Sequence, residues 1–340
     1  MTINLASLGW DDAFAADFER LASRPRGPSE LRPARVSRVD RGFCTALAAD
    51  GPVRASFSGA PLAGAAADPA QLPCAGDWVV VRAWPDDRLT AEAVLPRRTA
   101  IIRAAAGVEP QAQVLAANLD TVAVVEPMDP SPDLARIERL LALAYQSGAR
   151  PVVVLTKADL AAAPQAVAEQ VATASAGAEV FAASARTGKG LKPLQPFIAY
   201  GQTLGLLGPS GAGKSSLVNA LAGATVMGTK ALRADGRGRH TTTYRALIPL
   251  PDGGAVLDTP GVRLVGLYES AVGLERAFAD IAQLAIGCRF RDCRHDREPE
   301  CAVRAAIADG DLAPRRLASW KKLQREQSLE RARKIVIRRG

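Results

Sequence analysis

The chain has 340 residues, of which 48% are hydrophobic and 23% charged, a composition typical of ordinary globular proteins and a length sufficient for two or three domains. No apolar run reaches the roughly 18 residues that a membrane-spanning helix needs, and the first residues lack the basic and apolar segments of a signal peptide. These features argue against a membrane or secreted protein. The net charge of +8 favours a polyanionic partner, and we expect a cytoplasmic location.

Positive charge is concentrated in two stretches, residues 20–41 and 314–340. The second stretch carries two acidic residues, Glu326 and Glu330, against ten basic ones: Arg315, Arg316, Lys321, Lys322, Arg325, Arg331, Arg333, Lys334, Arg338 and Arg339. Either stretch alone is equally compatible with a solvated helical face. Neither has the apolar stripe of a lipid-binding helix, so together they favour RNA rather than a membrane as the partner.

Residues 1–33 form a predicted N-terminal extension with a short helix at 11–21. Beyond it the pattern changes to short β-like runs separated by turn signals, at residues 34–39, 43–47, 53–57, 77–81 and 91–95. The dipeptide Asp50-Gly51, between the second and third runs, is a hairpin signal. Five short strands within residues 34–97 predict an RNA-binding β-barrel of the OB-fold type, and a small SH3-like barrel would give a similar pattern.

Residues 97–113 show little periodicity and are expected to be a linker. The pattern then becomes α/β, with a helix at 134–145 and apolar strand runs at 119–125, 152–155, 180–182, 203–207 and 255–257. The motifs described below follow these strands, at the edge where open α/β sheets bind ligands. Residues 98–272 are therefore predicted to form a central α/β domain.

A phosphate-binding pattern follows the strand at 203–207. It consists of Gly208, Pro209, Ser210, Gly211, Ala212, Gly213, Lys214 and Ser215, and Ser216 continues into a predicted helix. Its glycines allow backbone N–H groups to close around phosphate oxygens, Lys214 neutralises β- and γ-phosphate charge, and the Ser215 hydroxyl ligates Mg²⁺. The motif predicts a nucleoside triphosphate site but does not separate ATP from GTP.

Thr156-Lys157-Ala158-Asp159 favours GTP and disfavours a P-loop ATPase or a metabolite kinase. In GTPases the Asp of this loop accepts hydrogen bonds from guanine N1 and N2, and the Lys stem lies over the base. The usual first residue is Asn, whose amide braces the nucleotide loops. Thr156 lacks that amide, so we expect a lower affinity with the choice of guanine left to Asp159. Ser184-Ala185 resembles the backbone contact to guanine O6.

Asp258-Thr259-Pro260-Gly261 is typical of a magnesium and γ-phosphate loop. Asp258 supplies a carboxylate for Mg²⁺, usually through water, and Gly261 an N–H for the γ-phosphate. Upstream, residues 237–243 form an Arg/Thr-rich loop that we expect to order on GTP, with Thr242 bound to Mg²⁺. A plain surface loop is the alternative explanation for this segment.

The catalytic water needs a further group. Val262 stands where many GTPases place the Gln that orients this water, which predicts slow intrinsic hydrolysis. One of the two histidines, His240, lies in the Arg/Thr-rich loop, and we hypothesise that it positions the water once a partner orders that loop. The predicted catalytic set is therefore His240, Lys214, Thr242 and Gly261.

The order of these motifs is unusual. The guanine loop at residues 156–159 precedes the phosphate loop at 208–215, whereas the phosphate loop comes first in most GTPases. The sequence therefore predicts a circularly permuted GTPase domain.

The odd number of cysteines, five, in a chain without a secretion signal argues against a disulfide framework. Cys44 and Cys74 fall in the β-rich region and are expected to be core residues. The other three join a histidine in the set Cys288, Cys293, His295 and Cys301, which predicts a closed structural zinc site. Free thiols or a redox pair are the alternatives. A helix is expected at 274–286, and residues 273–340 are predicted to be a zinc-binding helical domain with a basic C-terminal tail.

With these residues the chain resembles the ribosome small subunit-dependent GTPase A family (RsgA), from about residue 34 to about residue 325. The resemblance rests on the motif order, on residues 237–243 and 258–261, and on the spacing of the zinc ligands. It implies an N-terminal OB-fold, a permuted GTPase domain and a C-terminal zinc domain. It also implies a late role in maturation of the small ribosomal subunit, rRNA contact through both flanking domains, and subunit-stimulated GTP hydrolysis by a monomer. An RNA-binding clamp controlled by GTP, with negligible turnover, is the competing hypothesis.

Overall fold

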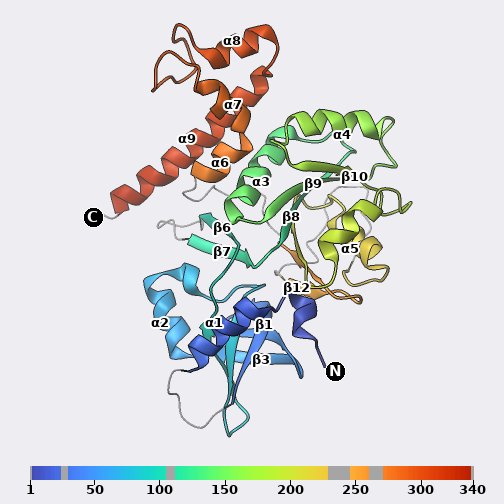
Figure 1. Cartoon of the computed structure of the whole chain (residues 1–340), viewed down its shortest axis with the longest axis vertical. Helices are drawn as coiled ribbons and strands as arrows, with labels where there is room; N and C mark the ends of the chain where they lie inside the picture. The colour runs from blue at the N-terminus through green and yellow to red at the C-terminus, as the bar shows by residue number, and fades with distance from the viewer. Residues whose placement is uncertain (1, 24–29, 105–111, 229–245, 260–270, 338–340) are drawn as a thin grey trace.

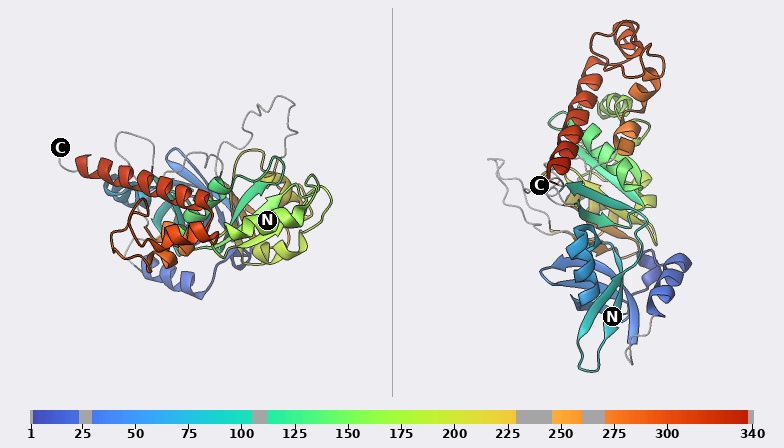
Figure 2. Two further views of the ribbon diagram at one scale, coloured as in Figure 1. Left: turned by 90° about the horizontal axis from the view of Figure 1, so that it is seen from above. Right: turned by 90° about the vertical axis from the view of Figure 1, so that its left-hand side faces the viewer.

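The computed structural model describes residues 2–23, 30–104, 112–228, 246–259 and 271–337. Three tiers follow one another along the long axis of the molecule: a β-barrel, a central sheet covered by helices, and a helical C-terminal region (Figure 1). The last helix runs from the C-terminal tier back alongside the central tier, as both Figure 1 and Figure 2 show.

The first tier is the predicted five-stranded barrel. Its strands close in the order β1-β2-β3-β5-β4, with only β3 and β5 parallel. A helix, α2 (Gly59–Ala67), and a short 3₁₀ turn, η2 (Pro69–Gln71), connect β3 to β4. The strands are β1 (Glu30–Asp40), β2 (Phe43–Ala48), β3 (Gly51–Phe57), β4 (Trp78–Ala83) and β5 (Leu89–Val94). β1 begins at Glu30, inside the stretch that the sequence pattern assigns to the extension.

The N-terminal extension packs on this barrel. It contains a 3₁₀ turn, η1 (Leu5–Leu8), and a helix, α1 (Asp12–Ala22), whose first turn is capped by the Asp11 carboxylate accepting from the Phe14 N–H at 3.1 Å. The rings of Trp10 and Phe14 lie against buried Trp78 of β4, with centroid distances of 4.8 and 5.8 Å. Aromatic burial therefore holds the predicted helix in place.

The second tier is a six-stranded sheet with the order β10-β9-β8-β11-β13-β12. Its strands are β8 (Thr121–Pro127), β9 (Arg150–Thr156), β10 (Glu179–Ala182), β11 (Thr203–Leu207), β12 (Ala246–Pro249) and β13 (Ala255–Asp258). All are parallel to their neighbours except β12, which pairs with β13 in the antiparallel sense. The five predicted strand runs are thus found, and β12 is an addition to them.

Helices cover both faces of the sheet. They are α3 (Leu134–Ser147), α4 (Pro164–Thr173) and α5 (Lys214–Ala222), with a 3₁₀ segment, η3 (Lys192–Ile198), before β11. Along β8, Val122 and Val124 join the apolar cluster of α3, whereas the alternate residues Ala123 and Val125 join the cluster of α5. The helix after β8 therefore covers one face of the sheet, and the helix after β11 covers the other. The boundary between β8 and β11 is the topological switch point, where α/β sheets bind ligands.

The predicted linker at residues 97–113 is wrong for much of its length. It contains β6 (Ala100–Ala104), which pairs with β7 (Ala112–Ala117) as a separate two-stranded sheet. Its arginines are fixed by ion pairs: Arg97 Nε lies 2.7 Å from Asp77 Oδ1, and Arg98 contacts both carboxylate oxygens of Asp11 at 2.5 and 2.6 Å. The arginines and alanines conceal the alternation of a strand, so the periodicity was too weak to indicate one.

Arg35 joins the first two tiers. It is fully buried on β1, where its guanidinium donates to the Leu8 carbonyl, to Thr203 Oγ1 at 2.8 Å and to the Asn118 carbonyl at 2.7 Å. Burial lowers the pKa of Arg35 to about 10, against the effects of Asp120 and Asp77, so the group remains charged at neutral pH. Arg35 of the basic stretch at 20–41 therefore serves as an internal connector and is not accessible to RNA.

The third tier contains α6 (Ala271–Ala277), α7 (Ala279–Ala285), α8 (Ala302–Asp309) and α9 (Pro314–Ile337). The helix predicted at 274–286 is broken at Phe278, which is fully buried and caps α7 with a non-helical backbone. The break lets α6 pack on α3 while α7 continues toward α8, at the end of the molecule opposite the barrel (Figure 1).

A buried charge network fixes α9 to the central tier. Arg316 on α9 is 3% exposed; it lies 3.0 Å from Glu138 Oε1 on α3, 2.9 Å from Asp280 Oδ1 on α7, and donates to the Ala277 carbonyl at 2.8 Å. Arg315 also reaches Glu138, at 2.9 Å, from the protein surface. Two arginines of the predicted basic tail, Arg315 and Arg316, are therefore held in ion pairs within the protein.

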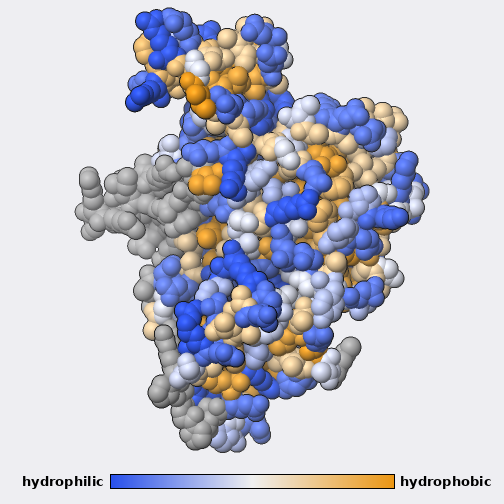
Figure 3. Space-filling view, viewed as in Figure 1, coloured by the Kyte–Doolittle hydropathy of each residue, from blue (hydrophilic) through white to orange (hydrophobic). Residues whose placement is uncertain are grey.

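On the face drawn in Figure 3, hydrophilic and hydrophobic residues are interspersed without one continuous apolar band. Among the residues that the structure describes, no helix is both long and apolar enough to cross a membrane.

The Arg316 network predicts unequal effects for two neighbouring arginines. Arg316→Ala leaves the fully buried Glu138 carboxylate without its buried partner, which should cost about 3–5 kcal/mol in the free energy of unfolding. Arg315→Ala removes a side chain that is 40% exposed and should cost about 1 kcal/mol or less. Urea unfolding followed by circular dichroism measures both values, and equal losses in the two variants would contradict this account.

Candidate functional site

The predicted motifs meet at one edge of the sheet. β8, β9, β10, β11 and β13 are parallel, so their carboxyl ends lie along the same edge. β11 leads to the phosphate loop and occupies the middle of the sheet. The guanine loop follows β9 on one side of β11, and Asp258 ends β13 on the other. The three loops are far apart in the sequence and follow one another in an unusual order. The fold nevertheless brings them together, as a circular permutation requires.

The phosphate loop begins at a position that only glycine fits. Gly208 has φ +154°, and a Cβ atom there would lie 2.2 Å from the Val125 carbonyl oxygen of β8. The loop ends where α5 begins at Lys214, so the first N–H groups of α5 face the loop. Lys214 Nζ donates to the carbonyls of Gly208 and Pro209, at 3.0 and 2.9 Å. The lysine therefore folds over its own loop.

The other loop residues differ in exposure. Ala212 is buried, Ser215 is half-buried within the first turn of α5, and Ser210, Gly211 and Ser216 are exposed. The Ser215 hydroxyl therefore lies where the loop meets the helix, next to Lys214.

Thr156 ties the guanine loop to the phosphate loop. Its buried hydroxyl donates to the carbonyl oxygen of Ala212, and Glu126 of β8 has its carbonyl 3.5 Å away. The expectation that Thr156 leaves these loops without a brace is therefore wrong. The shorter Thr side chain reaches Ala212 because the phosphate loop lies close to it at the next residue, Gly213. A Cβ atom added to Gly213 would lie 3.4 Å from Thr156 Oγ1.

Both carboxylate oxygens of Asp159 are engaged. Ser184 Oγ donates to Oδ1 at 2.5 Å, and Arg186 Nε donates to Oδ2 at 2.7 Å. The hydrogen bond from Ser184, followed by that from Arg186, lowers the pKa of Asp159. The carboxylate is therefore an ionised acceptor held in a fixed orientation.

The remaining guanine-loop residues lie beside Asp159. Lys157 is half-buried with φ +57°, and its Nζ approaches the Asp129 carbonyl at 3.5 Å. The Ala158 N–H donates to the Ala183 carbonyl at 3.2 Å, which joins this loop to the one carrying Ser184 and half-buried Ala185.

Arg186 was missed by the sequence interpretation. It occupies a loop position two residues beyond Ser184, and only its place after Ser184-Ala185 could have drawn attention to it. Its partner lies 27 residues away in the chain, so the ion pair becomes visible only in the structure.

Asp258 lies at the same edge. It is buried, and its Oδ1 atom has no hydrogen-bond partner among the described residues. Burial raises the pKa of Asp258, and the nearby Lys214 ammonium opposes this shift. Next to it, buried Thr259 donates to the Leu206 carbonyl at 2.6 Å and so fixes the end of β13 to β11. A cation bound here would satisfy the orphaned oxygen.

Three predicted catalytic residues, His240, Thr242 and Gly261, lie outside the described residues, as does the rest of the Arg/Thr-rich loop. The fourth, Lys214, lies at the edge already described.

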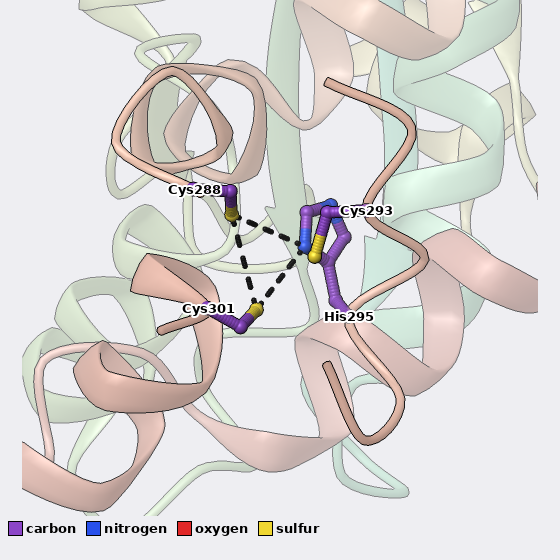
Figure 4. Close-up of side chains that lie close together, drawn as sticks. All are labelled: Cys288, Cys293, His295 and Cys301. Atoms are coloured by element: carbon purple, nitrogen blue, oxygen red, sulfur yellow. Dashed lines mark hydrogen bonds between the residues drawn. The ribbon is translucent and has the colours of Figure 1, made fainter. Parts of the chain in front are cut away.

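Cys288, Cys293, His295 and Cys301 converge in the C-terminal tier (Figure 4), with all four ligand atoms within 4.8 Å of one another. Cys288 follows α7, Cys301 precedes α8, and the other two lie on the loop between them. Lys321 of α9 donates to the His295 carbonyl at 2.9 Å and holds that loop. The predicted Cys/His cluster is confirmed as a group that could hold a metal ion.

The spacing of these atoms suits zinc. Zn–S and Zn–N bonds of about 2.3 and 2.0–2.1 Å in a tetrahedron give edges of about 3.8 Å between two sulfurs and about 3.6 Å between sulfur and nitrogen. Cys288 Sγ lies 3.8 Å from Cys301 Sγ and 3.6 Å from His295 Nδ1, which lies 3.4 Å from Cys301 Sγ. Cys44 and Cys74 are buried in separate apolar clusters, as expected.

Comparison with known proteins agrees with this geometry. A family model described as RsgA GTPase matches residues 94–268, just over half of the chain. A small ribosomal subunit biogenesis GTPase RsgA of Streptomyces coelicolor is 48% identical over 326 residues, which cover 95% of this chain and 86% of that protein.

Two solved structures share the fold. The crystal structure of YjeQ from Thermotoga maritima has a TM-score of 0.64 at 24% identity and covers 88% of this chain and 99% of its own. YloQ, described as a circularly permuted GTPase, has a TM-score of 0.59 at 23% identity and covers 90% of this chain and 98% of its own. Together with the motif order and the sheet topology, the family match and the close relative show that this chain belongs to the RsgA GTPase family.

Proposed function

We propose that this protein binds the small ribosomal subunit and hydrolyses GTP during late maturation of that subunit. The observation that carries the proposal is the meeting of the phosphate loop, the guanine loop and Asp258 at one sheet edge, in a permuted chain order. The Streptomyces relative, whose name describes a small ribosomal subunit biogenesis GTPase, supports the choice of partner.

Asp159 supports the choice of guanine. A carboxylate offers about four acceptor sites, and Ser184 and Arg186 occupy two of them. The remaining sites suit the two donors of guanine, N1–H and N2–H. Since the pKa of Asp159 is lowered, the group is ionised at neutral pH and accepts both. Lys157 would cover the base, and the backbone at Ser184-Ala185 would meet guanine O6.

Residues 208–216 would hold the phosphates. Backbone N–H groups of the loop and of the first turn of α5 would surround them. Lys214 would exchange its two loop carbonyls for phosphate oxygens, which are better partners for an ammonium because they are charged.

Ser215 and Asp258 fit a magnesium site. Asp258 has a buried oxygen without a partner among the described residues, and the Ser215 hydroxyl lies in the first turn of α5, which follows the neighbouring strand β11. When bound, Mg²⁺ would neutralise charge that develops on the phosphate oxygens. Thr242 is the further ligand that we propose from the sequence.

Hydrolysis requires a positioned water. We assign this role to His240, with the Gly261 N–H binding the γ-phosphate. Because Val262 replaces the usual Gln, the unassisted reaction would be slow, and a partner would be needed to complete the site.

Contact with rRNA would come from both outer tiers. On the barrel, exposed Arg54 lies 3.6 Å from the Phe43 ring centroid, and exposed Arg88 lies beside Trp84. On α9, Lys322 and Arg325 are exposed. Cations and aromatic rings suit phosphate contact and base stacking. We propose that the protein acts as a monomer in the cytoplasm.

The Cys/His cluster would hold one structural Zn²⁺. Three thiolates and an imidazole fill a tetrahedral coordination shell, which leaves no position for a reacting water. The metal would fix the loop between α7 and α8 and, through Lys321, its attachment to α9.

Small subunits should stimulate hydrolysis. Partners that complete a GTPase site raise turnover by about 10³–10⁵-fold, so we expect an increase of at least about tenfold over the free protein. Phosphate release with and without purified small subunits measures it. His240→Ala should lower the stimulated rate while leaving GTP affinity nearly unchanged. Nucleotide-dependent subunit binding without stimulated turnover would instead support a GTP-controlled RNA clamp.

The Thr156 brace should strengthen nucleotide binding. Thr156→Val preserves the shape of the side chain but leaves the Ala212 carbonyl without its hydrogen bond, a loss of about 1–3 kcal/mol. GDP affinity should fall by about tenfold, because the nucleotide must then order two uncoupled loops. Thr156→Ser keeps the hydroxyl and serves as the control. Fluorescent GDP titration checks both variants, and wild-type affinity in Thr156→Val would refute the role of the brace.

Zinc content tests the cluster. The purified protein should contain about one zinc per chain, and Cys293→Ser should lose it because three ligands no longer close the shell. Cys44→Ala changes a buried barrel cysteine and should keep the metal. Atomic absorption gives the ratio, and folded wild-type protein without metal would rule out a structural zinc.

A further inference from the structure

The N-terminal segment, residues 3–10, connects the barrel to the amino-terminal edge of the central sheet, opposite the nucleotide site, and we call it the N-terminal bracket. Its central contact is the carbonyl oxygen of Ser7, which accepts from the Gly254 N–H at 2.7 Å and from the Gly201 N–H at 3.2 Å. Gly201 precedes β11 and Gly254 precedes β13. One carbonyl thus joins the starts of the two strands that lead to the phosphate loop and to Asp258.

The other side of the bracket is fixed to the barrel. The Ile3 N–H donates to the Ala49 carbonyl at 2.8 Å, and the Leu8 carbonyl accepts from Arg35 of β1. Leu8 is 1% exposed and belongs to the same apolar cluster as Trp78 of the barrel and Leu257 of β13. Leu8 therefore anchors the bracket in the interface between the tiers.

The hairpin of β12 and β13 is well placed to sense the nucleotide. Its four paired positions run from Ala246 opposite Asp258 to Pro249 opposite Ala255. At one end, Asp258 is the acid proposed to hold Mg²⁺; at the other, the turn carrying Gly254 contacts the bracket. Four residues of strand span about 10 Å, so a rigid ladder transmits a shift of Asp258 to the turn.

The hairpin turn at Gly254 is closely packed against residues 198–199, which precede β11. A Cβ atom on Gly254 would lie 2.4 Å from the Ile198 carbonyl oxygen and 2.5 Å from that of Ala199. Asn4 Nδ2 of the bracket also donates to Tyr200 Oη at 2.7 Å, and Tyr200 follows directly after Ala199. A close-packed contact of this kind has discrete arrangements, formed or broken, and such elements carry coupling between sites.

We propose that the N-terminal bracket couples the nucleotide state to the barrel: binding of GTP with Mg²⁺ draws Asp258 toward the nucleotide, retracts the hairpin turn and releases it from Ser7. The inference rests on the proposed GTP site and adds an intramolecular route from that site to the barrel. In the GDP form the bracket would hold the turn through the Ser7–Gly254 hydrogen bond.

Hydrogen exchange measures the release directly. The amide of Gly254 should exchange about tenfold faster with a non-hydrolysable GTP analogue and Mg²⁺ than with GDP, within the usual 5- to 150-fold range of coupling between sites. Barrel amides near Ala49 should also exchange faster with the GTP analogue than with GDP. Equal exchange in the two states, with both nucleotides bound, would overturn the coupling. Failure of either guanine nucleotide to bind would instead refute the proposed function.

A reversible cross-link provides the second test. A Cβ atom on Gly253 would lie 3.5 Å from Ser7 Cβ, within the range of about 3.5–4.5 Å found in disulfides. Oxidised Ser7→Cys/Gly253→Cys should bind the GTP analogue about tenfold more weakly than its reduced form, with GDP affinity unchanged. Each single variant, oxidised in the same way, is the matched control. Equal affinity of the oxidised and reduced forms for the analogue would refute the release.

An uncoupling variant separates the bracket from general packing. Leu8→Ala weakens the bracket between the barrel and the hairpin, and should reduce the nucleotide-dependent difference in barrel exchange by about fivefold or more. Phe14→Ala removes a buried side chain of α1 that packs on Trp78, and should leave that difference intact. Equal reduction in both variants would indicate a general loss of packing and count against the bracket.

Discussion

A single buried guanidinium determines how the first two tiers meet. Arg35 arises from a barrel strand, and its donors end on the N-terminal segment, on the start of β11 and on the chain before β8. A charge in this position is stable only while those acceptors surround it, since an unpaired buried ion costs several kcal/mol. The barrel can therefore dock in one orientation. Arg316 imposes the same condition on the third tier, where its partners come from α3, α6 and α7. The central sheet is thus held between two arginine-centred junctions.

These junctions explain which expectations from the sequence succeeded. The barrel strands, the α/β alternation and the Cys/His cluster were predictable because each depends on local periodicity or on short spacing. The permutation was predictable because each of the three nucleotide-binding motifs is recognisable from its residue types, and their order can be read from the sequence. The burial of Arg35 and Arg316 was not, because a count of charges does not show which side chains lie between domains. Arg35 lies between Ala34 and Val36, both buried, but a barrel strand normally exposes alternate residues.

The nucleotide site was predicted in part for a similar reason. Residue types identified the loops, but the role of Thr156 depends on a carbonyl that lies 56 residues further along the chain. Comparison with the usual Asn suggested a lost contact, whereas in the structure the Thr156 hydroxyl donates to the Ala212 carbonyl. Strands β6, β7 and β12 were missed because the first two are short runs without apolar/polar alternation and the third has four residues ending in proline. The positions of His240, Thr242 and Gly261 remain predictions from the sequence.

The order of strands in the central sheet also constrains how the chain is made. Translation produces β8, β9 and β10 first, yet β8 pairs on its second side with β11, which follows them in the sequence. Until β11 emerges, β8 presents a row of unpaired backbone groups on an apolar strand, the kind of edge that invites association with other chains. β11, in the middle of the finished sheet, is thus synthesised after β8, β9 and β10. In a nascent chain that stops before residue 203, the edge of β8 beside which the nucleotide site later forms is therefore unpaired.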